Sequence, residues 1–315
     1  MFARRLFLIA ILGAATVAAT TRASNQVLLV TDSAQDTVRR YDLNGNYLGT
    51  VFDSGAGGVN QPLGLTIAPD GSLLVSGDLS RKVHRYDLTT GASLGVFAET
   101  PQMVGPAGMT FHNGALWVSD GRTGRVFRFD EDTGADLGPF LSGMAVPEAV
   151  IFDDNGKVIV GDWLRSEFRI YDEATGAFEG FVTRGNGLNR PLHAELSEDG
   201  SSLLAVNFFG NTLTEHDVET GDLLRSVDLR ANGSPMSGPV DWIALNDGTY
   251  IVSSTNNGLL LRYDADWIYT GIFAQGNATR AGAMVLVPSP GLGMVAAFGG
   301  VWATRRRTRP VSTRS

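Results

Sequence analysis

The sequence contains no cysteine in its 315 residues. Disulfide bonds, thiolate catalysis and cysteine-ligated metal centres are therefore excluded for this chain. Charged residues are also sparse, at 18% of the chain, while hydrophobic residues reach 43%, so wholesale disorder is excluded as well. Apolar stripes at helical spacing are few, whereas 39 glycines separate many short apolar runs. The composition predicts a folded protein made of short strands joined by turns.

Several enzyme motifs are absent from the sequence. It has no His-Glu-x-x-His pair, no Gly-Lys-Ser/Thr phosphate loop, and no Ser, His and Asp set with a recognisable spacing. Three of the four histidines, His84, His112 and His216, stand at different positions of the repeats described below. The sequence therefore contains no strong catalytic constellation.

One pattern is repeated six times between residues 27 and 287: an apolar run, an Asp that in most copies follows an aromatic residue, a turn and a second apolar run. Successive copies of this Asp are 45, 43, 42, 45 and 47 residues apart. A period of this size is typical of four-stranded propeller blades or of solenoid repeats. The repeated residues are Asp42, Asp87, Asp130, Asp172, Asp217 and Asp264.

Turn residues divide each repeat into strands. Thr-Gly or Asn-Gly pairs, such as Thr90-Gly91, supply the positive φ that a hairpin turn needs. The sixth copy has no glycine between Asp264 and Trp267, so we expect a different turn there. The last segment of each repeat begins with proline, and this Pro-x-Gly-like pattern resembles the NHL and related SMP-30-like propeller repeats, whose innermost strand carries it. The prolines are Pro62, Pro106, Pro147, Pro191 and Pro239.

The resemblance implies an all-β fold: a six-bladed β-propeller of four-stranded antiparallel blades over residues 24–286. Residues 281–286 would form the innermost strand of the last blade, and the N-terminal strands 27–30, 38–41 and 47–52 would complete it. Such closure removes the unpaired strand edges that favour aggregation. A solenoid is the alternative architecture, but it would need capping repeats, and the sequence shows none.

Strand alternation predicts which side chains of the innermost strands face the central channel. Counting from each proline, the second and fourth residues face the channel, and the mostly apolar third and fifth lie between blades. His193 and Glu195 of one blade and Asp241 of the next are then expected to converge, and Glu148 would join them only at the rim. The small residues opposite, expected to leave room for a ligand, are Gly64, Gly108 and Gly282.

One histidine and two carboxylates suit a divalent cation such as Ca²⁺, or an acid/base pair. His193, Glu195 and Asp241 are therefore candidate metal ligands, with solvated channel side chains as the alternative. Gluconolactonase-type propellers resemble this chain in architecture and hold an axial metal with Glu, Asn and Asp, a set that this sequence does not reproduce. Three functions stay open: a non-catalytic binding module, which the absent motifs favour, a metal-dependent hydrolase or lyase, and a matrix or envelope scaffold with no small ligand.

Two further groups of residues recur in the loops. A residue that is repeated in most blades is expected to bond the turn backbone through its side chain, rather than to form one calcium site. Aromatic residues replace polar ones in two loops, which predicts either a carbohydrate or protein contact surface or simple loop packing. The repeated residues are Asp32, Asp78, Asp120 and Asp162, with Asn207 and Ser254 at the equivalent places, and the aromatic ones are Trp163, Phe208 and Phe209.

The N-terminus has the three-part layout of a secretory signal over residues 1–23. Arg4 and Arg5 precede an apolar stretch from Leu6 to Ala19, and small residues follow. The apolar run is shorter than the ~20 residues that a membrane span needs. We therefore expect export by the Sec route, or by the Tat route, since the twin arginines resemble that signal.

The C-terminus resembles the PEP-CTERM sorting signal over residues 287–309. The motif reads Val287-Pro288-Ser289-Pro290, with Ser in place of the usual Glu, and a short apolar segment from Leu292 to Ala303 follows. The resemblance implies transient membrane retention by that helix, processing by an exosortase-type enzyme, and delivery to the cell envelope, surface or matrix of a bacterium. A simple membrane anchor is the alternative. The basic cluster that would stay cytoplasmic is Arg305, Arg306 and Arg307, and residues 310–315 form a basic tail.

Charge narrows the range of partners. All 33 acidic residues, but only 17 of the 25 basic ones, lie between residues 24 and 290. A surface this negative repels phosphate backbones, so nucleic acid is not expected as a partner. No cofactor is assigned beyond the candidate divalent cation, and an extracellular glycan or protein remains the expected type of ligand.

Overall fold

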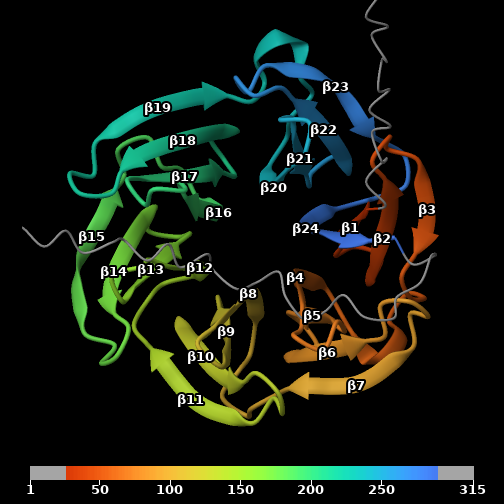
Figure 1. Ribbon diagram of the computed structural model, residues 1–315, viewed down its shortest axis with the longest axis horizontal. Helices are drawn as coiled ribbons and strands as arrows, with labels where there is room; N and C mark the ends of the chain where they lie inside the picture. Colours follow the sequence, from red (N-terminus) through yellow and green to blue (C-terminus); the bar gives the residue numbers. More distant parts are fainter. Residues whose placement is uncertain (1–25, 290–315) are drawn as a thin grey trace, which may run out of the picture.

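The computed structural model describes residues 26–289 and contains six four-stranded antiparallel sheets arranged around one axis (Figure 1). It is an all-β, six-bladed propeller, as the sequence predicts. Helix is confined, within these residues, to two short 3-10 turns, Ala56–Gly58 and Ala231–Gly233.

Five blades are each formed by four consecutive strands, ordered from the axis outwards. Blade 1 consists of β4 (Pro62–Ile67), β5 (Leu73–Gly77), β6 (Lys82–Tyr86) and β7 (Ser93–Ala98), and blade 2 of β8 (Pro106–His112), β9 (Ala115–Asp120), β10 (Arg125–Asp130) and β11 (Asp136–Leu141). Blade 3 consists of β12 (Pro147–Phe152), β13 (Lys157–Asp162), β14 (Glu167–Asp172) and β15 (Phe178–Arg184), and blade 4 of β16 (Pro191–Leu196), β17 (Ser202–Asn207), β18 (Thr212–Asp217) and β19 (Leu223–Asp228). Blade 5 consists of β20 (Pro239–Ala244), β21 (Tyr250–Ser254), β22 (Leu259–Tyr263) and β23 (Tyr269–Ala274).

Blade 6 closes the ring by joining the two ends of the described chain. Its innermost strand is β24 (Ala281–Pro288), which pairs with β1 (Gln26–Asp32), and β2 (Thr37–Asp42) and β3 (Tyr47–Thr50) follow outwards. The predicted closure is therefore confirmed. The last strand is longer than expected: Val287 pairs with Val27 and is only 2% exposed, and Pro288 pairs with Gln26. The propeller thus ends at Pro288 rather than at residue 286, and it includes the first two residues of the expected sorting motif.

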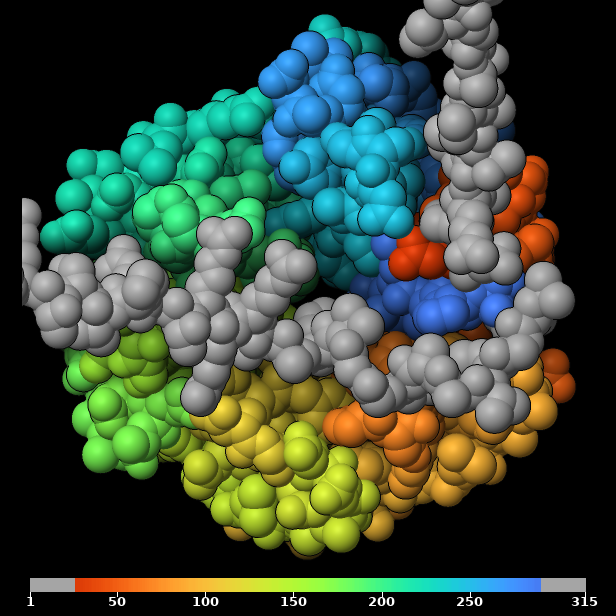
Figure 2. Space-filling model, in the orientation of Figure 1, coloured from red at the N-terminus to blue at the C-terminus, as the bar shows by residue number. Residues whose placement is uncertain are grey.

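The core lies between blades, because alternate side chains of each strand point to opposite faces of the sheet. In β5, Leu73 and Val75 pack against blade 6, whereas Leu74 packs against Phe127 and other apolar residues of blade 2. Each blade is therefore held by apolar contacts on both faces, and the space-filling view shows neighbouring blades, such as blades 1 and 2, packed against each other (Figure 2).

The glycines of the predicted turns adopt positive φ, between 69° and 85° in the five copies. A side chain at Gly91 would also place its Cβ 1.7 Å from the carbonyl oxygen of Val51 on the neighbouring blade, so the turn needs glycine for two reasons. The sixth turn differs, as expected: Trp267 itself adopts φ of 64° and stacks on Tyr250.

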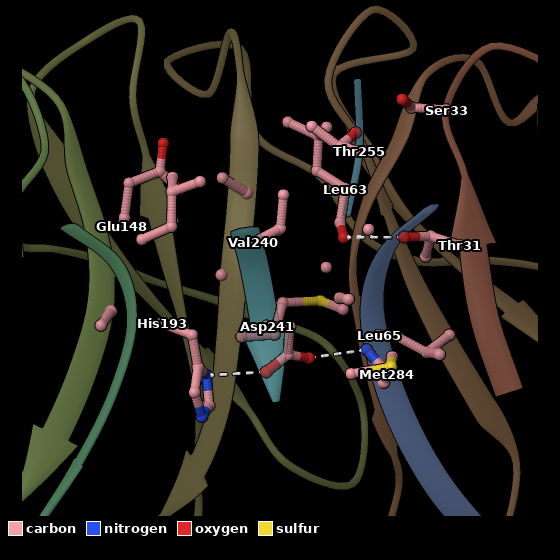
Figure 3. A pocket seen from close by; sticks show the side chains of 18 of the residues that line it. Thr31, Ser33, Leu63, Leu65, Glu148, His193, Val240, Asp241, Thr255 and Met284 are labelled. Carbon is pink, nitrogen blue, oxygen red and sulfur yellow. Dashed lines mark hydrogen bonds and ion pairs between the residues drawn. The ribbon is translucent and has the colours of Figure 1, made fainter. Parts of the chain in front are cut away.

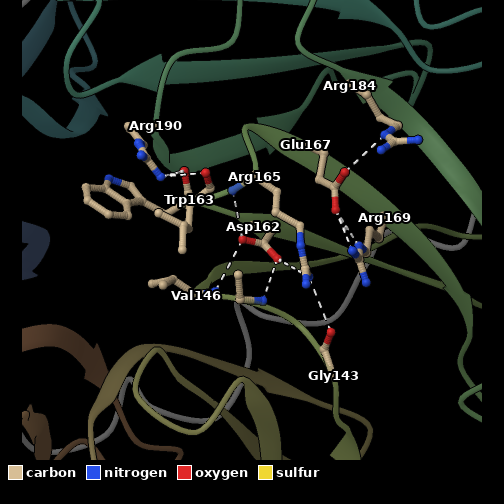
Figure 4. A network of polar contacts seen from close by, with 11 residues as sticks. Gly143, Val146, Asp162, Trp163, Arg165, Glu167, Arg169, Arg184 and Arg190 are labelled. Atoms are coloured by element: carbon tan, nitrogen blue, oxygen red, sulfur yellow. Dashed lines mark hydrogen bonds and ion pairs between the residues drawn. The ribbon is translucent and has the colours of Figure 1, made fainter.

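The recurring carboxylates hold the loops at one end of the blades, which confirms their structural interpretation. Asp162 accepts hydrogen bonds from the backbone N–H groups of Ala145, Val146 and Arg165, so it joins the loop before β12 to the loop after β13 (Figure 4). Asp120 and Asp32 accept equivalent bonds in their own blades. Asp78 is the exception, because its carboxylate binds the Arg122 guanidinium of blade 2 at 2.7 and 2.6 Å.

Candidate binding pocket on the propeller axis

A pocket of about 720 Å³ lies on the axis of the ring. Its wall comes from the innermost strands of all six blades, and its mouth comes from loops at one end of the blades. The mouth residues lie either directly before an innermost strand or directly after a second strand. They include Gln61, Val146 and Arg280 of the first kind, and Ser33, Trp163, Phe208 and Thr255 of the second.

A β-bulge near the start of each innermost strand shapes this wall. In β4, Pro62 pairs with Gly77 but Leu65 pairs with Val75, so Leu63 and Gly64 together lie opposite one residue of β5. A bulge of this kind interrupts strict alternation. As a result, the first and second residues after the proline both line the pocket in blades 1 to 5. The strict alternation expected from the sequence is wrong at this point of the strand.

The glycines on the wall do not leave room for a ligand, contrary to the expectation. A Cβ on Gly64 would lie 2.1 Å from the carbonyl oxygen of Ala107 in the next blade, and one on Gly108 would lie 2.6 Å from that of Glu148. In blade 6, the Cβ of a residue at Gly282 would meet the Thr31 hydroxyl at 2.5 Å. These glycines allow neighbouring strands to approach closely at the axis, where the ring is narrowest.

The three predicted ionisable residues do come together. The Nδ1 atom of His193 lies 3.3 Å from Oδ1 of Asp241, and its Nε2 atom lies 3.0 Å from Oε1 of Glu195. The other oxygen of Asp241 accepts a 2.7 Å hydrogen bond from the backbone N–H of Met284 (Figure 3). This cluster therefore joins the innermost strands of blades 4, 5 and 6.

Burial and charge act in opposite directions within this cluster. Burial by itself lowers the pKa of His193, but the Asp241 charge and the contacts with Glu195 outweigh it, and the net pKa is raised. Burial raises the pKa of Asp241, against the effects of the His193 charge and the Met284 N–H group. The side chain of Glu195 is 58% exposed and that of Asp241 only 9%, so the pair of His193 with Asp241 is the better protected from solvent.

The geometry does not favour the divalent-cation interpretation of His193, Glu195 and Asp241. A metal needs ligand atoms that converge on one point, whereas here the imidazole stands between the two carboxylates and faces one with each ring nitrogen. Within residues 26–289, no group of three or more His, Asp or Glu side chains is placed to hold a metal ion. The arrangement is that of a structural ion-pair chain.

Glu148 lies on the pocket wall in blade 3, away from that chain of ion pairs (Figure 3). Among the described residues, its carboxyl group forms no hydrogen bond and no ion pair. Burial, with a smaller contribution from the Asp78 charge, raises its pKa to about 8. A carboxyl group in this setting is mostly protonated at neutral pH.

An aromatic rim stands at the mouth over blades 3 and 4. Trp163 and Phe208 line the pocket, while Phe209, 59% exposed, lies beside both, with ring centroids 6.0 and 5.0 Å away. Arg190 extends across Trp163, with its guanidinium carbon 4.6 Å from the ring centroid, and bonds the backbone carbonyls of Trp163 and Leu164 (Figure 4). We call Trp163, Phe208 and Phe209, together with the neighbouring Leu164, the aromatic rim.

Sequence reasoning missed several pocket residues. Strict alternation does not predict the apolar wall of Leu63, Leu192 and Val240, because the bulge that turns these side chains inward cannot be recognised in any single strand. The Asp78–Arg122 pair was also missed, since it joins two blades and the two residues are 44 positions apart. Aligning the residue after each proline across the repeats would have found the first group.

Comparisons with known proteins support the fold. A solved structure of a nidogen/laminin complex contains a chain that is 14% identical to this one, with a TM-score of 0.66, and the match covers 84% of this chain and 99% of that chain. A protein of unknown function from Bacteroides caccae is 13% identical, with a TM-score of 0.65 and coverage of 83% and 98%. No protein-family model matches, and no curated protein sequence matches. The chain therefore shares a propeller architecture with these structures.

The expected signal peptide, residues 1–23, and the sorting segment from Pro290 onward, including Arg305, Arg306 and Arg307, lie outside the described residues. Between residues 26 and 289, no helix has the length and apolar character required to span a membrane.

Proposed function

We propose that this protein is an exported, non-catalytic recognition module that binds a partner through the axial pocket and the aromatic rim. The observation that carries the proposal is the uneven distribution of side chains at equivalent positions of the six repeats. The residue directly after the second strand is Ser33, Asp78, Gly121, Trp163, Phe208 or Thr255, so large aromatic groups gather on two neighbouring blades.

The fold itself does not require these aromatic residues, because four blades form the same loop without them. Leu164 and Phe209 are 47% and 59% exposed, and they lie beside a pocket large enough for a small ligand or a side chain of a partner. Exposed apolar residues that cluster next to a concave site are typical of recognition surfaces. An extracellular peptide, protein or glycan would fit such a surface.

The proposed place of action follows from the chain ends. Residues 1–23 would direct export, and the segment that begins at Val287 would be retained in the membrane for a time and processed by an exosortase-type enzyme. Because Val287 and Pro288 belong to β24, cleavage that leaves the propeller intact would fall after Pro288. The mature propeller would then reach the cell envelope or its surroundings.

The test is a binding screen with a protein that spans residues 24–289, which contains every strand of the ring. Peptide and glycan arrays are probed with the wild type and with a Trp163→Ala, Phe209→Ala double variant. Leu94→Ala is the matched control, since Leu94 is 53% exposed but lies on the outermost strand β7. We expect a ligand whose binding falls about tenfold or more in the rim variant and is unchanged in the control. Equal loss in both variants, or none in either, would contradict the proposal.

A further inference from the structure

Glu148 is the exception in an apolar wall. It is the first residue after the proline in β12, and the equivalent residues of the other blades are all apolar. The fold therefore does not need a carboxyl group at this position. Those equivalent residues are Leu63, Ala107, Leu192, Val240 and, from the register of β24 against β1, Gly282.

Glu148 is half-buried, and its carboxyl oxygens are open to the pocket. Within residues 26–289, no side chain or backbone group donates a hydrogen bond to this carboxyl, so its partner is solvent or a ligand. The Asp78 charge contributes to the raised pKa of Glu148, and Asp78 is itself paired with the guanidinium of Arg122. Glu148 is thus left as a hydrogen-bonding group directed at the pocket, across from Thr31 and Ser33 (Figure 3).

We propose that the pocket binds an organic cation: a protonated amine attached to an apolar body, with the nitrogen on the Glu148 carboxylate. This inference rests on the proposed function and names the ligand chemistry of the same site. The apolar body would contact Leu192, Val240 and the other wall residues, while the amine would supply the partner that Glu148 lacks. A free amine and a lysine side chain of a partner share this chemistry.

The other charged groups around the pocket are consistent with a cation at Glu148. Asp78 follows β5 of blade 1, and Asp241 lines the pocket with His193 as its partner. Arg280 is at the mouth, on the opposite blade of the ring, and Arg122 is held by Asp78. Because the Glu148 carboxyl is mostly protonated below pH 8, binding of a cation there would release one proton to solvent.

The experiment uses three probes with the same apolar body: phenylbutylamine, phenylbutanol and phenylbutyrate. Calorimetric titration of the residue 24–289 protein in buffers of different ionisation enthalpy measures affinity and proton release together. We expect the amine to bind about tenfold or more tightly than the alcohol, since a charge-assisted hydrogen bond is lost in the latter. Affinity for the amine should rise from pH 6 to pH 9, with a proton released below pH 8.

Two variants and one control separate the outcomes. Glu148→Gln and Glu148→Leu should abolish the preference for the amine. Leucine is compatible with the fold at this position, because blades 1 and 4 have leucine at the equivalent place. Glu179→Gln is the control, as Glu179 lies on the outer strand β15 of the same blade. Equal affinity for amine and alcohol, or an unchanged preference in both Glu148 variants, would overturn the inference.

A peptide with one central lysine, compared with its acetyl-lysine counterpart, distinguishes the two sources of the amine. Preference for the lysine peptide over phenylbutylamine indicates a partner side chain, and the reverse indicates a free small molecule. Failure of every amine to bind, while the aromatic rim still recognises an array ligand, would remove this inference and leave the proposed function standing.

Discussion

The imidazole of His193 lies 3.3 Å from the Asp241 carboxylate, so an ion pair joins the innermost strands of blades 4 and 5. Blades 1 and 2 make a different contact at the equivalent position of their innermost strands, where Gly64 lies against the backbone carbonyl of Ala107. The repeats thus use two different contacts at the narrowest part of the ring. One is charged and depends on pH, and the other depends only on the absence of a side chain.

The first prediction concerns the coupling of His193 to its two carboxylates. A double-mutant cycle with His193→Gln and Asp241→Asn should give a coupling energy above about 1 kcal/mol, because Asp241 is nearly buried. The same cycle with Glu195→Gln should give less than about 0.5 kcal/mol, because Glu195 is mostly exposed. Urea unfolding of the four variants in each cycle measures both values.

The coupling also has a predicted pH dependence. The pKa of His193 is raised in the folded protein, so the stability that the charged imidazole contributes is present below about pH 6.5. That contribution is lost as pH rises through the folded pKa. A His193–Asp241 coupling that stayed constant from pH 5 to pH 9 would show that the ion pair does not stabilise the ring.

The second prediction concerns the C-terminal boundary of the propeller. A protein that ends at residue 286 lacks Val287, which is buried against blade 1, and loses two pairs of the ladder with β1. It should be less stable than one that ends at residue 289 by about 2 kcal/mol or more. Thermal unfolding of the two proteins measures the difference, and equal midpoints would place the end of the fold before Val287.

The third prediction concerns close approach at the axis. Gly64→Ala should destabilise the protein by about 2 kcal/mol or more, since the new methyl group would meet the Ala107 carbonyl oxygen. Ala149→Gly is the matched control, because it makes the reverse change at the equivalent position of blade 3. Its cost should be about 0.5–1 kcal/mol, the usual effect of glycine in a strand. Denaturant unfolding checks the order of the two, and similar values would mean that the blades can separate slightly at no cost.

The fourth prediction concerns Glu148 and stability. Its pKa is about 8 when folded and near 4.5 when exposed, so between these values only the folded state keeps the proton. The contribution of the protonated Glu148 carboxyl to the free energy of unfolding is therefore fully present below about pH 4.5, and it is lost as pH rises through 8. Glu148→Gln removes the effect, and its melting temperature should exceed that of the wild type by at least about 3 °C at pH 9.

The control for this measurement is the same comparison at pH 5, where the difference should nearly vanish. A constant difference at both pH values would indicate that the carboxyl ionises normally in the folded protein.

Much of the fold could be predicted from the sequence because each blade repeats the same pattern of turn residues and alternating apolar residues. A glycine such as Gly91 indicates a hairpin turn, and a proline such as Pro62 indicates the start of an innermost strand. The alternation of apolar residues between them predicts which side chains face the neighbouring blade. Six copies of one pattern also give the number of blades and the composite closure. The end of β24 is harder to predict, because Val287 fits both a strand pattern and the expected sorting motif.

The site was harder to predict because it depends on contacts between blades. The prediction that His193, Glu195 and Asp241 lie close together is confirmed. The imidazole stands between the two carboxylates, however, and this arrangement disfavours a metal. It depends on the relative positions of two blades, which no local sequence pattern gives. The bulges decide which residues line the pocket, and Glu148 lies on its wall for that reason.

A crystal structure of the residue 24–289 protein with phenylbutylamine bound would show directly whether Glu148 holds an amine. We expect the amine nitrogen within about 3 Å of a Glu148 carboxyl oxygen and the phenyl group against the apolar wall below the aromatic rim. An amine bound elsewhere, with the Glu148 carboxyl facing only water, would contradict this expectation.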